Sequence, residues 1–101
     1  MPSMYPIRTS IYPLPTAYRK PIEFMTGGKA ICIKGGRALV LDLLIDAGSN
    51  GIDRSATLRW VANISDTICA LRSRGIVIQT CKWQPANYVL RSEVLRLGAE
   101  T

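Results

Sequence analysis

The sequence predicts an α+β fold that is mostly α, with three helices followed by a two-stranded β-hairpin and preceded by an extended N-terminal arm. Three observations lead to this prediction. Apolar residues recur at helical spacing between residues 37 and 74, β-branched residues cluster at 76–80, and prolines crowd the first 28 residues. At 101 residues and 48% hydrophobic, the chain has material for one core. We therefore expect an arm over residues 1–28 and one domain over residues 29–101.

The arm is set apart by its prolines, which alternate with tyrosines and basic residues. Five of the six prolines lie there: Pro2, Pro6, Pro13, Pro15 and Pro21. Proline removes a backbone donor and biases the preceding residue toward extended conformations, so little regular structure is expected. Two interpretations stay open. The arm packs against its own domain or a second copy, or its Arg8, Arg19 and Lys20 follow a DNA backbone or enter a minor groove.

Two glycine pairs, Gly27-Gly28 and Gly35-Gly36, bracket a segment in which residues 30–33 are expected to form a short strand. Glycine pairs beside lysines also suggest a phosphate-binding loop. Such a loop needs Gly-Lys followed by Ser or Thr at the start of a helix, whereas Lys29 is followed by alanine. We therefore interpret these glycines as turns.

The first helix is expected from Arg37 to Ala47, with Gly48 just beyond its end. One face carries apolar residues at i, i+3, i+4 and i+7, namely Val40, Leu43, Leu44 and Ala47. Further apolar residues widen this arc beyond what one small core needs: Leu39, Leu41 and Ile45. The surplus indicates either a partner surface or cover by the N-terminal arm.

Two more helices are expected from their capping residues. Asp53 is placed to cap a second helix that runs to about Trp60, and Asn63, or alternatively Ser65, to cap a third. The third helix spans residues 64–74, and its inward stripe consists of Ile64, Ile68 and Leu71. Gly75 follows it and permits a left-handed exit.

The hairpin is expected next, with residues 76–80 and 88–90 as its strands and residues 81–87, which include Pro85, at its tip. Tyr88 and Leu90 are expected to face the core together with Ile76 and Ile78. A short final helix is expected over residues 91–98, capped by Ser92.

Three helices followed at once by a hairpin is the order of a winged helix–turn–helix domain. The run from Ile68 to Ile78, closed by Tyr88-Val89-Leu90, resembles the I-x-x-L-R-x-x-G-I-x-I … Y-x-L signature of small winged helix–turn–helix proteins, which are common in bacteriophages and prophages. The resemblance covers roughly residues 37–90. It implies that the third helix enters the DNA major groove and that the hairpin is a wing against the DNA backbone.

The outward face of the third helix is expected to hold Asp66, Cys69, Ala70 and Ser73, by steps of about 100° per residue. This face lacks the Arg, Lys, Asn and Gln side chains that usually read base edges. The candidate DNA-binding residues are therefore partly on this helix and partly around it: Arg54, Arg59, Thr67, Ala70, Arg72, Ser73, Arg74, Lys82 and Trp83.

Two of these candidates have alternative interpretations. Arg72 either contacts DNA or pairs with Asp42 or Asp46 or caps a helix end. Trp83 either lies against a sugar or a partner protein at the tip of the hairpin, or folds back over the core.

Composition narrows the function. The 13 Lys and Arg residues against 7 Asp and Glu give a net charge of +6, which favours a polyanionic partner. Cys32, Cys69 and Cys81 lack the paired spacing of a zinc site and are interpreted as reduced, mostly buried thiols of a cytoplasmic protein, so no metal or cofactor is expected. No signal peptide or membrane-spanning run is seen.

The sequence gives no indication of catalysis, because the chain has no histidine, no pair of carboxylates at a spacing that indicates acid–base chemistry, and no nucleophile with an evident base. The sequence thus predicts a homodimeric transcription regulator that binds double-stranded DNA. The alternative is an interaction protein, such as an inhibitor of a host enzyme or defence complex, or an assembly factor. RNA binding through the tyrosines and arginines of the arm is a third hypothesis, with no RNA-binding signature behind it.

Overall fold

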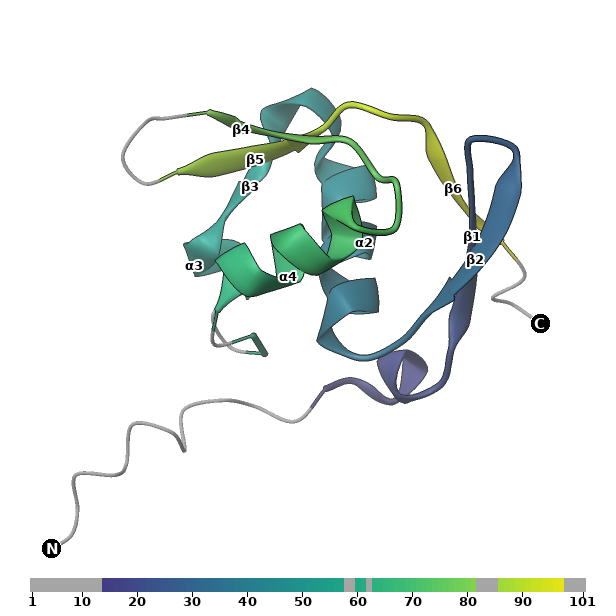
Figure 1. Cartoon of the computed structure of the whole chain (residues 1–101). Helices are drawn as coiled ribbons and strands as arrows, with labels where there is room; N and C mark the ends of the chain where they lie inside the picture. Colours follow the sequence, from purple (N-terminus) through teal and green to yellow (C-terminus); the bar gives the residue numbers. More distant parts are fainter. Residues whose placement is uncertain (1–13, 58–59, 62, 82–85, 98–101) are drawn as a thin grey trace, which may run out of the picture.

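The computed structural model describes residues 14–57, 60–61, 63–81 and 86–97 (Figure 1). In these ranges the elements are η1 Thr16–Arg19, β1 Ile22–Thr26, β2 Lys29–Ile33, α2 Gly36–Ala47, η2 Gly48–Asn50, β3 Ile52–Asp53, α3 Arg54–Thr57, α4 Ile64–Arg72, β4 Ile78–Cys81, β5 Asn87–Leu90 and β6 Val94–Leu97. None of the helices described has the length and apolar character needed to span a bilayer.

The strands form two antiparallel sheets of three strands each, with orders β2-β1-β6 and β3-β5-β4. The predicted fold class, mostly α with a single hairpin as wing, is therefore wrong, because the described residues contain two sheets beside their three α-helices. The predicted hairpin is present as β4 and β5, but β3 pairs with β5 as a third strand. Figure 1 shows this sheet at one end of the molecule and the sheet β2-β1-β6 at the other.

In the sheet β2-β1-β6, β2 confirms the short strand predicted over residues 30–33, whereas β1 and β6 lie in the segments predicted to be arm and terminal helix. In β1, Ile22, Phe24 and Thr26 are buried while Glu23 is exposed, which is the alternation of a strand with one face on the core. Gly27 and Gly28 both have positive φ, at 58° and 79°, and this allows the tight turn that joins β1 to β2.

The prediction of little regular structure is thus wrong for residues 16–28, and the prediction of a helix over 91–98 is wrong because residues 94–97 form β6. Residues 1–13 of the predicted arm lie outside the described residues. The expected boundary between residues 28 and 29 falls inside the β1–β2 hairpin. β6 pairs with the other edge of β1, with Met25 opposite Leu95. A strand is favoured there because β1 offers it a row of backbone donors and acceptors.

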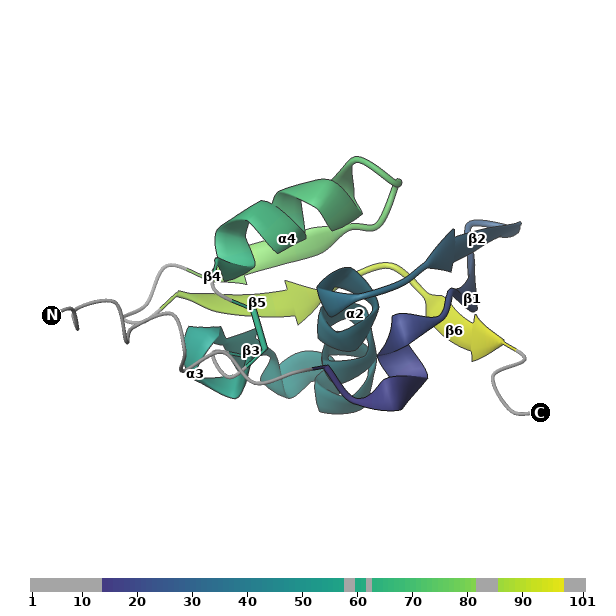
Figure 2. The ribbon, with the colours of Figure 1, turned by 90° about the horizontal axis from the view of Figure 1, so that it is seen from below.

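This sheet and η1 contact α2, the helix with a surplus of apolar residues. Leu39 and Leu41 are buried at 5% and 0% exposure, and Tyr18 of η1 packs against the core cluster to which Leu41 belongs. Contact with the N-terminal segment is thus found for part of α2, and a partner surface on this helix stays a prediction. Figure 2 shows η1 and α4 on opposite sides of α2.

The helices largely follow their predicted caps. Asp53 Oδ1 accepts a hydrogen bond from the Ser55 amide at 3.0 Å, and α3 is described over Arg54–Thr57, while residues 58–59 of the predicted helix lie outside the described residues. Asn63 Oδ1 accepts from the Asp66 amide at 3.2 Å and caps α4 as predicted.

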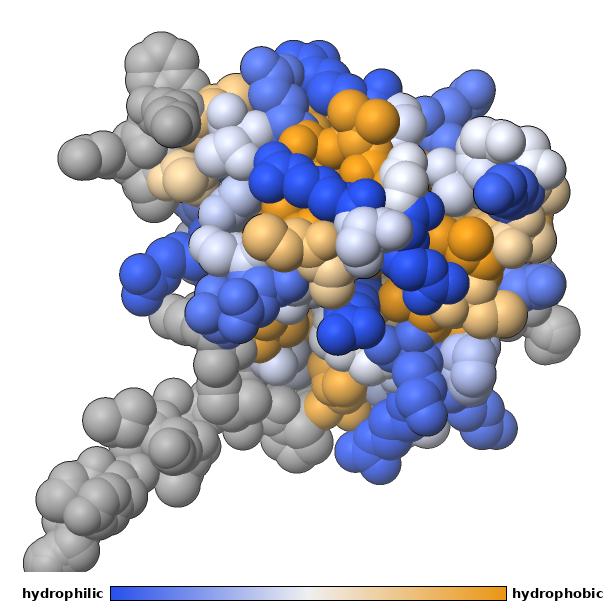
Figure 3. Space-filling model, viewed as in Figure 1, coloured by the Kyte–Doolittle hydropathy of each residue, from blue (hydrophilic) through white to orange (hydrophobic). Residues whose placement is uncertain are grey.

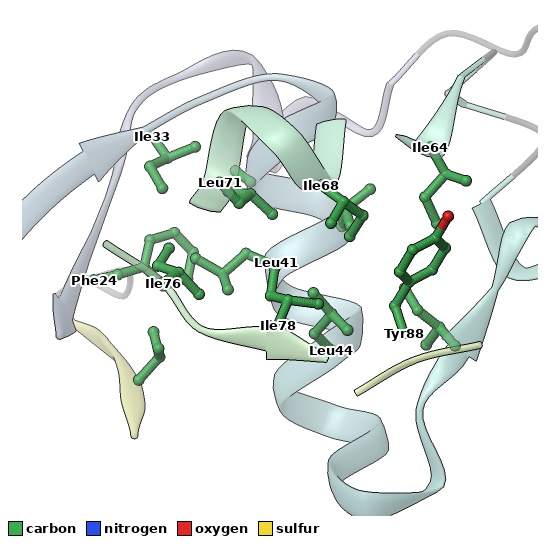
Figure 4. Close-up of a cluster of buried hydrophobic side chains, with 14 of the residues drawn as sticks. Phe24, Ile33, Leu41, Leu44, Ile64, Ile68, Leu71, Ile76, Ile78 and Tyr88 are labelled. Atoms are coloured by element: carbon green, nitrogen blue, oxygen red, sulfur yellow. The ribbon is translucent and has the colours of Figure 1, made fainter. Parts of the chain in front are cut away.

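The core joins both sheets and the helices. Figure 4 shows Phe24 from β1, Leu41 and Leu44 from α2, Ile68 and Leu71 from α4, and Ile78 from β4 pointing into one cluster. The predicted inward stripe of α4 is buried at 7%, 1% and 0% exposure for Ile64, Ile68 and Leu71. Each such side chain stabilises the fold by about 1.5–3 kcal/mol, so α4 has a fixed place on the surface.

Candidate nucleic-acid interface

α4 presents one side to solvent while its apolar stripe is buried. Asp66, Cys69 and Ser73 are exposed, and Thr67 and Ala70 are half-buried. This confirms the predicted outward face. Figure 3, seen from the side on which α4 lies, shows hydrophilic side chains across the middle of the surface with apolar ones between them.

The two hydroxyl candidates on α4 are bonded to their own helix. Thr67 Oγ1 donates to the Asn63 carbonyl at 3.4 Å, and Ser73 Oγ donates to the Ala70 carbonyl at 2.7 Å. Each hydroxyl keeps its acceptor lone pairs. Both side chains therefore lie against the helix, and its outward face carries few protruding groups.

Arg72 holds α4 to the neighbouring sheet. Its guanidinium donates to the Ile78 carbonyl from Nε at 3.1 Å and from Nη2 at 2.6 Å, and to Thr80 Oγ1 at 2.9 Å. The predicted pairing with Asp42 or Asp46 is not found. We infer a structural task for this side chain, because several of its five donors are used on β4.

Asp42 is instead part of a network on the η1 side of α2. Its carboxylate pairs with the Arg96 guanidinium and accepts a hydrogen bond from the Tyr18 hydroxyl at 2.5 Å. Burial, and then this hydrogen bond, raise the pKa of Tyr18 above its usual 10.0. This network fixes β6 and η1 on α2 and lies away from α4.

Arg74 lies just beyond the end of α4 and borders a surface hollow of about 200 Å³. Its Nη2 donates to the Cys32 carbonyl on β2 at 3.4 Å. The other lining residues come from β2 and the position after it, from α2 and from α4: Cys32, Ile33, Lys34, Arg37, Ala70 and Leu71.

Sequence reasoning missed Lys34 and Arg37, which the fold brings to the same hollow as Arg74. Both are exposed. Their one sequence signal is that they flank Gly35-Gly36, a pair interpreted only as a turn. Both residues lie more than thirty positions before Arg74, so the sequence gives no sign that they are close to it. The packing of α4 on α2 brings them together.

The remaining candidates are divided between the described and undescribed parts of the chain. Arg54 is exposed on α3 and does not line the hollow. Beside it, Asp53 has its pKa lowered, chiefly by the hydrogen bond from the Ser55 hydroxyl at 2.6 Å. Arg59, Lys82 and Trp83 lie outside the described residues.

The cysteines are less buried than predicted. Cys32 and Cys69 are exposed and Cys81 is half-buried, and all three are free thiols. The expectation of mostly buried thiols is therefore wrong. Within the ranges described, His, Cys, Asp and Glu side chains form no group of three that would hold a metal ion.

Comparison of the chain with family models, with curated proteins and with solved structures finds no significant match. The geometry of the chain itself is therefore the basis for a functional proposal.

Proposed function

We propose that this chain is a non-enzymatic protein of the cytoplasm that binds double-stranded DNA and regulates transcription. The observation that supports this proposal best is α4, a helix anchored on the surface with a shallow outward face and basic side chains at its C-terminal end. The regulatory task and a phage or prophage setting rest on the sequence resemblance alone.

The dimensions of α4 suit a DNA groove. A helix with its side chains is about 10–12 Å wide, and the major groove of B-DNA is about 12 Å wide. Short side chains at Cys69, Ala70 and Ser73 leave the helix narrow on its outward side. The backbone of α4 can then approach base edges closely.

The chemistry of the outward face favours particular contacts. A carboxylate such as that of Asp66 accepts a hydrogen bond from the N4 amine of cytosine, and a methyl group such as that of Ala70 packs on the C5 methyl of thymine. Such contacts give modest sequence preference. Most of the affinity then comes from phosphate contacts by basic residues.

Titration of the full chain against a labelled duplex of about 20 base pairs, two helical turns, tests the proposal. We expect binding that weakens with rising salt. Cys69→Glu places a negative charge in the middle of the outward face and should weaken binding by roughly tenfold or more, as an adverse groove contact costs about 1–3 kcal/mol.

The matched control is Ala17→Glu, which adds the same charge at an exposed position of η1, across α2 from α4. It should weaken duplex binding by less than about threefold, because one added charge far from the contact changes only the general electrostatic attraction to DNA. Equal losses for the two variants would contradict α4 as the DNA-contacting helix. Absence of binding to any duplex at low salt would contradict DNA binding itself.

A second candidate function, protein–protein interaction, is favoured by the outer face of the sheet β2-β1-β6. Cross-strand register places Met25, Ala30, Leu95 and Leu97 together there, with Glu23 and Cys32 beside them, and Leu95 is 57% exposed. An apolar sheet face of this kind is typical of a contact surface. A homodimer built on this face would also supply the two DNA-contacting helices that a two-half-site operator requires.

Light-scattering mass measurements on the wild-type chain and on Leu95→Glu separate these outcomes. A dimer that becomes a monomer in the variant supports self-association through this sheet. A monomer in both cases excludes it. Capture of a protein from a nuclease-treated host lysate by the wild-type chain, but not by Leu95→Glu, would then support the interaction function.

A further inference from the structure

The hollow lined by Lys34, Arg37 and Arg74 combines three cations on one small concave surface. The three side chains come from three places in the fold: the end of β2, the first turn of α2 and the residues after α4. The lining contains no carboxylate. Among the described residues, the ion pair found is that between Arg96 and Asp42, so these three cations have no anionic partner there.

Like charges gathered in this way repel one another unless an anion joins them. Arg74 is directed toward β2 by a long hydrogen bond to the Cys32 carbonyl at 3.4 Å. A guanidinium has five donors in a planar fork, so Arg74 keeps several N–H groups for a ligand. Fork-shaped donors suit the paired oxygens of a phosphate group.

The size of the hollow fits a small anion. Its volume is about 200 Å³. A single phosphate group with some of its water fits this space. Its lining includes the short side chain of Ala70 and the buried Leu71.

We infer that this hollow binds one phosphate group, and, given the proposed function, that the group is a backbone phosphodiester of the duplex that α4 contacts. Ala70 belongs to both the outward face of α4 and the hollow. A phosphate held there fixes α4 at its C-terminal end and sets how the helix lies relative to the groove. The part of this inference about DNA rests on the proposed function, whereas the phosphate site itself does not.

The experiment compares the wild-type chain with two variants of equal charge. Lys34→Gln/Arg37→Gln/Arg74→Gln removes the cations of the hollow, and Ala17→Glu/Lys29→Gln/Arg91→Gln makes the same change of charge at three exposed positions elsewhere. Each variant lowers the net charge from +6 to +3, since each of its three substitutions lowers it by one. All six side chains are exposed, and matching circular dichroism spectra and melting curves establish that both variants fold.

Duplex affinity is measured over a series of salt concentrations. One phosphate contact adds about 0.9 to the slope of log K against log salt, which at about 0.1 M salt equals roughly an eightfold change in affinity. We expect the hollow variant to have a slope smaller by about 0.9 and an affinity lower by roughly eightfold, and the control variant to keep the wild-type slope. Equal changes in the two variants overturn the inference and leave the proposed function standing.

Inorganic phosphate is the second probe, followed through the amide NMR signals of the wild-type chain. Saturable shifts confined to residues around the hollow, and absent in the hollow variant, support the phosphate site even if no duplex binds. If the wild type binds neither a duplex nor inorganic phosphate at the hollow, the inference and the proposed function both fail. Duplex binding with a normal slope in the hollow variant overturns the inference alone.

Discussion

Phe24 offers a sharp test of the fold, because it lies in the segment that the sequence predicts to be an arm. Its side chain is 0% exposed and sits in the cluster that joins β1, α2 and α4. Replacing it with alanine forfeits burial worth about 1.5–3 kcal/mol and leaves a cavity, and together these cost about 3–5 kcal/mol. In a domain of this size the melting temperature should fall by at least about 12 °C, at roughly 4 °C or more per kcal/mol.

The assay is urea unfolding of the full chain, followed by circular dichroism and tryptophan fluorescence. Glu23→Ala serves as control, because Glu23 precedes Phe24 on the same strand but is exposed on the opposite face. The control should stay within about 0.5 kcal/mol of the wild type. Phe24→Ala should unfold at a clearly lower urea concentration with an unchanged slope. Equal midpoints for the two variants would refute the packing of β1 into the core.

Three further predictions concern a turn, a network and a helix anchor. Gly51→Ala should destabilise the chain by about 1–3 kcal/mol more than Gly28→Ala in chemical unfolding, and equal losses would count against this. Both glycines have positive φ, but a Cβ at position 51 would lie 2.8 Å from the Tyr88 carbonyl oxygen, while one at 28 meets no described atom within 4 Å. Because the pKa of Tyr18 is raised above 10.0, its contribution to stability should be complete below pH 10 and be lost as the pH rises through the pKa of the folded state. Tyr18→Phe should abolish this loss of stability at high pH in melting curves, and an unchanged loss would contradict the prediction. Arg72→Lys should cost about 1 kcal/mol of unfolding free energy, because the fork on β4 is lost, yet leave duplex affinity within about twofold, since the charge remains. A variant of unchanged stability but tenfold weaker binding would make Arg72 a DNA contact.

The helices could be predicted because their signals are local. The side chain of Asn63 caps α4 by accepting from the amide three residues further along. The spacing of Ile64, Ile68 and Leu71 identifies the buried stripe without knowledge of the elements it packs against. The hairpin likewise follows from two short runs close in the sequence. These features need no contact between distant parts of the chain.

The sheet β2-β1-β6 could not be predicted in the same way, because its pairing spans almost the whole chain. Met25 meets Leu95 across seventy positions, and residues 94–97 alone suit a helix as well as a strand. The prolines up to Pro21 also suggested an irregular segment through residue 28, whereas β1 begins at Ile22. The alternation of Ile22, Glu23 and Phe24 was the available signal, but it is only a few residues long.

The candidate site divides along the same line. Ala70 and Ser73 could be placed on the outward face of α4 from helical geometry, and the structure keeps them there. Arg72 looked equally available, yet its guanidinium is used on a β4 carbonyl whose position depends on the turn after α4. Lys34 and Arg37 become relevant only once α2 packs against α4. A surface helix can thus be recognised from its own residues, whereas tertiary packing decides which charges lie beside it to contact a phosphate backbone. The two triple variants measure the contribution of these charges to duplex affinity directly.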